Sequence, residues 1–175
     1  FKLNKFLSSE KINVNEERAI WVICNYILWK ISPKLTKIEK SDFNFLYELL
    51  KQRNSYENIS HDSIPAYEKH VEFILSKPYD NWYVVNSMFG NIGSVYISKN
   101  NEIGLHMLKN FDSTIIKDDI FEQVMKKNPR KNYLVNINPK NNLMKKFLEQ
   151  KKFHLKIPFE ESKKKFPEDT YELIF

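Results

Sequence analysis

Cysteine and glycine are scarce in this chain of 175 residues: Cys24 is its only cysteine, and it has three glycines. A single cysteine cannot form an internal disulfide, which fits a reducing compartment, and we expect a cytoplasmic protein. The four histidines and Cys24 show no spacing typical of a metal site, so we expect none. No apolar run approaches the roughly 20 residues that a membrane-spanning helix needs, so the sequence predicts no membrane span.

What the chain does contain is typical of a folded domain. It is 42% apolar and 14% aromatic, which argues against disorder. Its net charge of +6 would suit a nucleic acid or a polyanionic small molecule. However, lysines are scattered over most polar faces and the aromatics follow core periodicities, so nucleic-acid binding is the weakest hypothesis. Phe1 in place of a methionine indicates truncation, processing or a preceding region.

The first 30 or so residues form an extension. Asn15 is a plausible N-cap for a helix over residues 16–30 that is apolar on nearly every face, and Pro33 ends it. The favoured interpretation is a core helix, and the alternative is a contact to a second subunit, as in a homodimer, or to a preceding domain. We therefore divide the chain into an extension over 1–34 and a domain over 35–175.

In the domain over 35–175, the spacing of the apolar residues changes along the chain between the spacing typical of strands and that typical of helices. Turns at 88–92 and 99–102 are too short for crossovers, which predicts an antiparallel meander. The predicted elements are a strand over 35–39, helices over 42–53 and 64–75, strands over 82–87, 93–98 and 103–108, a helix over 117–127, a strand over 132–138, a helix over 141–151, and strands over 153–157 and 170–175.

This order of elements resembles the GNAT acetyltransferase superfamily. The family segment Asn-Pro-x-Asn-x-x-Ser-x-x-Phe-Tyr-x-x-x-Gly-Phe is similar to Asn138-Pro139-Lys140-Asn141 with Phe147 and Phe153 behind it. The resemblance implies an α/β (α+β) fold with a mixed, mostly antiparallel central sheet. That sheet would be splayed between its fourth and fifth strands and covered by helices on both faces, with the N-terminal apolar helix added.

The resemblance also implies acetyl-coenzyme A as co-substrate, lying in the gap of the splayed sheet. An unpaired strand edge needs a partner or a ligand in any case, because buried amides left alone are costly. The implied cofactor-binding residues are the backbone near Met107, Leu108 and Lys109, the side chains of Asn138 and Asn141, and the charge of Lys117.

Two segments depart from the family. The pyrophosphate loop, Arg/Gln-x-x-Gly-x-Gly/Ala, aligns with Asp112 at its first position and with Ile115 and Lys117 at its glycines. Glycine lets backbone approach phosphate, and Asp112 would oppose phosphate electrostatically, while Lys117 would compensate in part. In the second segment the replacements of the family's Ser, Tyr and Gly are Met144, Leu148 and Lys152. Either another residue protonates the leaving thiolate, or the chemistry has been lost.

Acid and base groups must then come from elsewhere. His106, on the fourth strand, is the candidate catalytic base, since an imidazole with a pKa of about 6.5 suits deprotonation of an amine; the alternative is a histidine that fills the sheet face. Arg53 and His61 are candidates for holding an anionic acceptor such as a nucleotide diphosphate, or are plain loop residues. Residues 58–61 and 67–71 are similar to those of enzymes that acetylate nucleotide-linked amino sugars.

These observations leave an N-acetyltransferase acting on a primary amine as the first hypothesis. The alternative is a catalytically degenerate GNAT-like module that has kept the fold for binding or assembly. The missing glycines and the apolar first helix favour that alternative.

The docking interpretation of the first helix has a direct test. Deleting residues 1–31 should shift the protein to monomer in analytical sedimentation while thermal unfolding, followed by circular dichroism, stays cooperative. Loss of folding would instead place the helix in the core.

Overall fold

The computed structural model describes residues 32–53, 64–161 and 167–175. The chain divides into two units, Phe1–Ser32 and Pro33–Phe175. The described helices and strands all belong to the second unit. The apolar helix predicted over 16–30 lies outside the described residues, so the division into 1–34 and 35–175 stays a prediction.

The order of elements confirms the prediction for this unit. In chain order they are β1 (Lys34–Lys37), η1 (Lys40–Asp42), α3 (Phe43–Lys51), α4 (Tyr67–Leu75), β2 (Asn81–Ser87), β3 (Gly90–Ile97), β4 (Ile103–Met107), η3 (Lys109–Phe111), α5 (Thr114–Lys127), β5 (Asn132–Ile137), α6 (Asn142–Gln150), β6 (His154–Ile157), η4 (Phe159–Glu161) and β7 (Asp169–Ile174). The predicted start of α5 at Lys117 was wrong. The helix begins at Thr114 because Oγ of Ser113 accepts a hydrogen bond from the amide of Ile116 and caps it.

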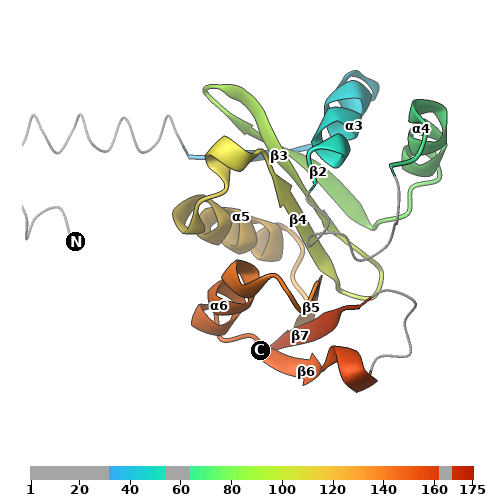
Figure 1. Ribbon diagram of the computed structural model, residues 1–175. Helices are drawn as coiled ribbons and strands as arrows, with labels where there is room; N and C mark the ends of the chain where they lie inside the picture. Colours follow the sequence, from blue (N-terminus) through green and yellow to red (C-terminus); the bar gives the residue numbers. More distant parts are fainter. Residues whose placement is uncertain (1–31, 54–63, 162–166) are drawn as a thin grey trace, which may run out of the picture. The chain divides into compact units, whose positions relative to one another are not determined.

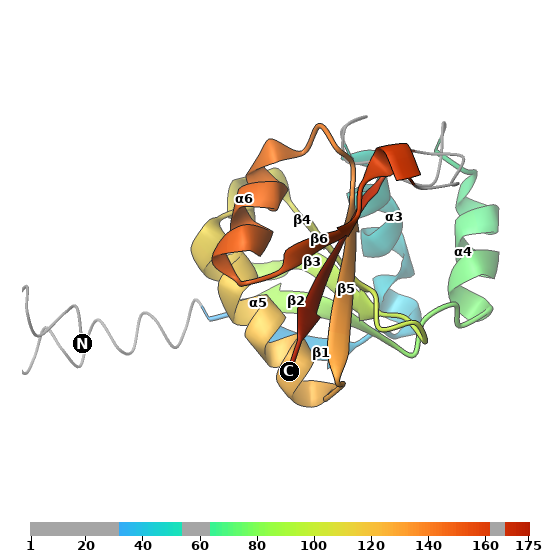
Figure 2. The same ribbon diagram turned by 90° about the horizontal axis from the view of Figure 1, so that it is seen from below.

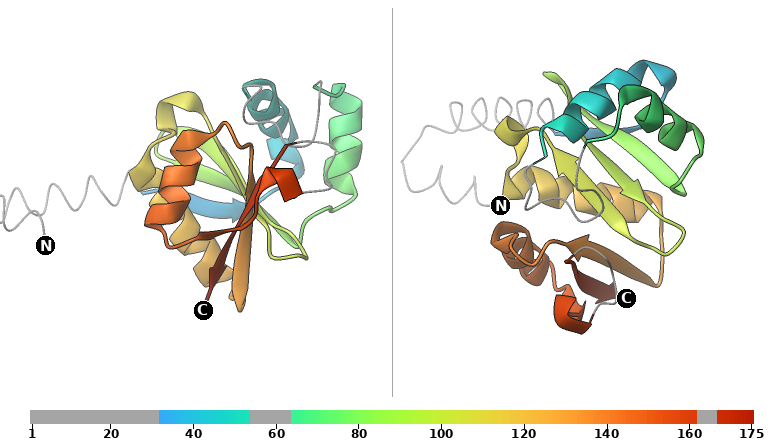
Figure 3. Two further views of the ribbon diagram at one scale, coloured as in Figure 1. Left: turned by 60° about the horizontal axis from the view of Figure 1, so that its bottom comes forward. Right: turned by 45° about the vertical axis from the view of Figure 1, so that its right-hand side comes forward.

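The strands form two antiparallel sheets that meet at one point. The first has the order β1-β2-β3-β4 and the second has the order β5-β7-β6. An isolated parallel bridge between Glu102 and Leu134 joins them, and the two sheets are seen one above the other in Figure 1 and in the right panel of Figure 3. The fold is therefore mixed, mostly antiparallel, and splayed between β4 and β5, as predicted.

Helices cover both faces of the strands. Figures 1 and 2 show α5 and α6 on one side and α3 and α4 on the other. Adjacent strand residues point to opposite faces, so Val84 and Val85 of β2, both fully buried, belong to different clusters. Val85 lies in the larger cluster with residues of α5 and α6.

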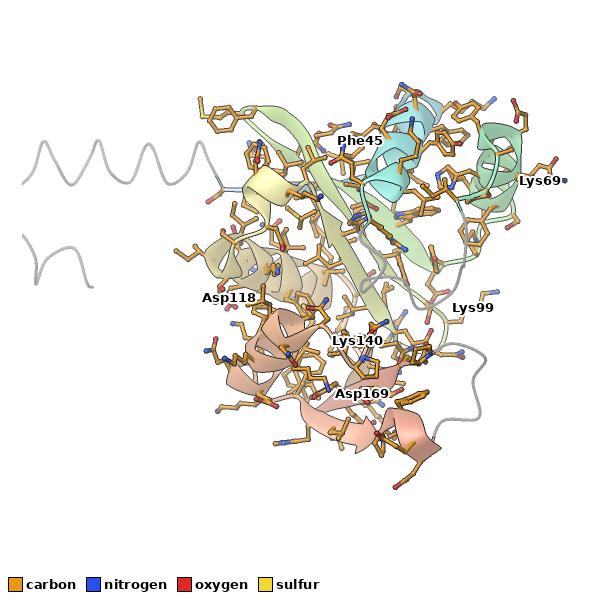
Figure 4. All side chains as sticks on the ribbon, in the orientation of Figure 1. Phe45, Lys69, Lys99, Asp118, Lys140 and Asp169 are labelled. Carbon is orange, nitrogen blue, oxygen red and sulfur yellow. The ribbon has the colours of Figure 1, made fainter. Side chains whose placement is uncertain are left out.

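The smaller cluster fixes α3 and α4 on the first sheet. Val84 packs there with Leu46 of α3 and Ile74 of α4, and Phe45, labelled in Figure 4, packs against them. Burial of each large aliphatic side chain contributes roughly 1.5 to 3 kcal/mol. The end of α3, where Arg53 follows, is thereby positioned over β3 and β4.

Helix α6 ends in a Schellman motif without glycine. The amide of Phe153 donates to the carbonyl of Leu148 at 2.9 Å, and the amide of Lys152 donates to that of Glu149 at 3.0 Å. Lys152 holds a φ of 65°, a left-handed conformation that favours glycine. This is the position where the family segment has Gly, so the backbone keeps the turn although the residue has changed.

Replacing Lys152 with glycine should therefore stabilise the protein. A non-glycine residue in this conformation costs roughly 1 to 2 kcal/mol, and part of that gain is offset by the freer unfolded chain, so we expect about 0.5 to 1 kcal/mol from urea unfolding. Lys152→Ala is the matched control, since it removes the same exposed side chain and keeps the strain. Equal stabilities of the two variants would contradict the explanation.

Candidate active site

The two sheets separate because their contact is confined to one end. The amide of Leu134 donates to the carbonyl of Asn101 at 2.9 Å, beside the bridge at Glu102. The carboxylate of Glu102 accepts from the side chains of Asn136 at 3.1 Å and Ser98 at 3.2 Å. Between the described residues of β4 and β5 there is no strand ladder beyond this bridge.

The backbone of β4 alternates between β3 and the opening. The carbonyl of Glu102 accepts from the amide of Ser98, directly after β3, and the amide of Leu108 donates to the carbonyl of Ile92 in β3. In an antiparallel ladder, bonding to one neighbour occurs at every second residue, so the backbone of Met107 points away from β3, toward the opening. The amide of Leu108 is bonded to the carbonyl of Ile92, so the predicted contact of Leu108 with a cofactor, which stays a prediction, would need another atom of that residue.

The segment after β4 carries an internal ion pair. Lys109 opens η3, and Nζ of Lys117 lies 2.7 Å from the carboxylate of Asp112. Ile115 is in the first turn of α5 with 81% of its surface exposed. Ile115 is thus a helical residue, which corrects the expectation of a loop up to Ile116, whereas Lys117 is helical as predicted. The Lys117 charge is already directed at a carboxylate.

Asn138 and Asn141 have local structural roles. Oδ1 of Asn138 accepts from the amide of Lys140 at 3.0 Å, and Oδ1 of Asn141 accepts from the amide of Met144 at 3.1 Å, capping α6. Asn138 is buried, and Lys140, in the same turn, is labelled in Figure 4. Contact of either asparagine with a cofactor stays a prediction.

His106 and Arg53 meet on the face of the sheet that α3 and α4 cover. Nε of Arg53 donates to Nδ1 of His106 at 3.1 Å. Burial, and then the charge of Arg53, lowers the pKa of His106 to about 3. The imidazole is therefore neutral with its acceptor nitrogen occupied, and its predicted action as a base requires Arg53 to move away.

Aromatic side chains line the sheet beside this pair. The rings of Tyr79 and Tyr96 are stacked, with 3.6 Å between their centroids. The ring of Trp82 meets that of Tyr79 edge-on, with 5.0 Å between centroids. A Cβ at Gly104, opposite Tyr96 in the ladder, would overlap the Tyr96 ring. The missing side chain at Gly104 thus lets Tyr96 lie flat against β4, two residues from His106.

Several of these residues escaped the sequence interpretation. Tyr79 lies between Pro78 and Asp80 in the connection to β2, where no pattern marked it. His70 belongs to the segment 67–71 that is similar to amino-sugar acetyltransferases, but it was not a candidate site residue; it is buried, and its Nε2 finds no hydrogen-bond partner in the described part of the chain. His61 lies outside the described residues.

Comparison with known proteins identifies the fold of the chain. No family model matches the sequence, and no curated protein matches it. In structure, the chain is similar to a domain from Methanocaldococcus jannaschii DSM 2661 (16% identity, TM-score 0.66, 83% of this chain and 99% of that one). The chain has the GNAT fold.

Two further structures with this fold have a stated activity. Spermidine N-acetyltransferase from Vibrio cholerae, solved with CoA and spermine, is 13% identical with a TM-score of 0.65, over 82% of this chain and 95% of that one. An acetyl transferase from Salmonella typhimurium that modifies the N-terminal serine of ribosomal protein L7/L12 is 16% identical with a TM-score of 0.62, over 82% and 95%. At these identities the likeness shows the fold alone.

The described residues offer neither a metal site nor a membrane-spanning helix. They contain no group of three or more His, Cys, Asp or Glu side chains able to hold a metal ion. None of their helices is long and apolar enough to cross a bilayer.

The capping role of Asn141 can be separated from a cofactor role. Asn141→Ala should lower the free energy of unfolding by about 1 kcal/mol, because the Met144 amide loses its acceptor. Asn141→Asp keeps the cap and should retain most of the stability in the same denaturant titration. If the alanine variant is as stable as the parent, the capping role is wrong.

Proposed function

We propose that this domain transfers an acetyl group from acetyl-coenzyme A to a primary amine. The observation that carries the proposal is the opening between β4 and β5, toward which the backbone of Met107 points without a strand partner. Structures of the same fold include a spermidine N-acetyltransferase bound to CoA and a ribosomal L7/L12 α-N-protein acetyltransferase bound to coenzyme A. Acetyl-coenzyme A would supply the activated thioester.

One part of the opening suits acetyl-coenzyme A, and another part opposes its pyrophosphate. The backbone of Met107 is available to pair with the pantetheine amides. At the start of α5, by contrast, Lys117 is held by Asp112 and the Ile116 amide by Ser113, so a pyrophosphate would meet a carboxylate and a helix end that is already capped. We therefore expect weak binding of coenzyme A.

The acceptor side lies on the face that holds Arg53 and His106. Arg53, with His61 as its predicted partner, would bind the acceptor, and His106 would take the proton of the amine. An amino sugar linked to a nucleotide fits a site with a partly buried arginine. The protein is proposed to act in the cytoplasm, as a homodimer or beside a preceding domain through residues 16–30.

One observation favours the second hypothesis, a degenerate module of the same fold. Leu148, at the position of the family's tyrosine, is fully buried in the core and carries no acidic proton. A domain that lost its acid and placed Asp112 where phosphate should bind would keep the fold for assembly.

Coenzyme A binding decides between the two. Calorimetry should give a weak but measurable affinity, and Asp112→Asn should tighten it several-fold, since the carboxylate would no longer repel the phosphates and Lys117 would be released from its ion pair to bind them. The matched control is Asp80→Asn, which removes a carboxylate paired with Arg130 outside this segment. Thiol release with a panel of amines then measures turnover. If neither the parent protein nor Asp112→Asn gives a heat of binding at millimolar coenzyme A, the acetyltransferase proposal is wrong and the degenerate binding module remains.

A further inference from the structure

Arg53 is a partly buried cation that has no carboxylate partner among the described residues. The chain's other described arginine, Arg130, lies 2.9 Å from Asp80. None of the ion pairs among the described residues includes Arg53. A charge removed from water is costly unless it is paired, so the position of Arg53 is explained if an anion joins it.

The hydrogen bonds of Arg53 are also incomplete. A guanidinium has five N–H donors arranged to match a carboxylate or a phosphate. In the described structure its side chain makes one hydrogen bond, from Nε to Nδ1 of His106. The remaining donors are thus available to a ligand that arrives over β4.

The groups around Arg53 are neutral. Burial raises the pKa of Tyr79 and of Tyr96, so both remain uncharged hydroxyls. Burial, and then the charge of Arg53, lowers the pKa of His70, which is neutral as well. The nearby carboxylate of Glu102 is engaged by Ser98 and Asn136. The described surroundings, with residues 54–63 left out, therefore do not compensate the charge of Arg53.

We propose that the acceptor amine carries an anionic group, a carboxylate or a phosphate, whose binding to Arg53 draws the guanidinium from Nδ1 of His106 and frees this nitrogen for the amine's proton. The inference rests on the proposed function, in which Arg53 binds an anionic acceptor, and adds that this binding must come first because it makes His106 available as the base. An amine without the anion leaves Nδ1 occupied and the base inactive.

The proton transfer needs only the substrate and His106. The N–H bond of the substrate ammonium breaks, an Nδ1–H bond forms on His106, and the positive charge moves from substrate to imidazolium. The amine keeps the electron pair with which it attacks. The anion bound to Arg53 stabilises the new imidazolium, because it lies between two cations.

The coupling can be measured without acetyl transfer. Histidine NMR of the full chain, with His106→Gln to identify the signals, follows the titration of His106 as inorganic phosphate or acetate is added. The nearby titratable groups are Arg53 after α3, His70 on α4, Tyr79 before β2, Tyr96 on β3 and Glu102 before β4. Without added anion, His106 should remain neutral down to a pH of about 3. A bound anion should raise the pKa of His106 by about one unit or more.

Two variants make the result specific. In Arg53→Met the response of His106 to phosphate and acetate should disappear. Arg130→Met, which removes an equal charge already paired with Asp80, should respond like the parent. A His106 titration that ignores both anions in the parent protein overturns the proposal and leaves Arg53 as a structural link between α3 and β4.

Turnover separates this inference from the proposed function. With glucosamine 6-phosphate against glucosamine, and β-alanine against propylamine, the anionic member of a pair should have a kcat/KM at least ~100-fold higher, and Arg53→Met should remove most of the preference. Acetylation without any preference for the anionic amine overturns the inference and keeps the acetyltransferase. An NMR response without coenzyme A binding or acetylation supports the anion-coupled pair and rejects the acetyltransferase.

Discussion

Where β4 and β5 separate, the backbone N–H and C=O groups that lose a neighbouring strand need other hydrogen-bond partners. The rest of the domain depends on how this need is met. Glu102 pins β4 to β5 at one end through Asn136, and the isolated bridge with Leu134 goes no further. Strand β5 obtains its ladder from β7 on the other side. Strand β4 obtains its ladder from β3 alone, so one edge of it stays directed at the opening.

In the two helices that begin near the opening, side-chain oxygens already accept hydrogen bonds from amides of the first turn. Ser113 caps α5 and Asn141 caps α6, each through a side-chain oxygen. Together with the Asp112 and Lys117 pair, these bonds complete internally what a phosphate-bearing ligand would otherwise complete. The strand edge and the helix ends thus differ in how many hydrogen-bonding groups they leave for a ligand. The acceptor face leaves the most, because Arg53 has no carboxylate partner in the described part of the chain.

Much of this architecture was predictable because it depends on period and order. The alternation of strands and helices predicted the sheets, and Phe147 and Phe153, which carry part of the family resemblance, are both in the core. The local chemistry was not predictable. A lysine does not by itself indicate the positive φ at position 152, where the family segment has Gly, and no spacing relates Arg53 to His106, which are 53 positions apart. The start of α5 was missed because a single Ser113 cap extends it by one turn.

The close approach of Tyr96 to Gly104 has an evolutionary consequence. The tyrosine ring occupies the volume that any side chain at position 104 would need. Positions 96 and 104 are therefore expected to vary together among relatives, with a larger residue at 104 accompanied by a smaller one at 96. A chain that changed only position 104 would lift the aromatic stack of Tyr79 and Tyr96 from β4 and alter the surroundings of His106 without changing any residue that binds a substrate.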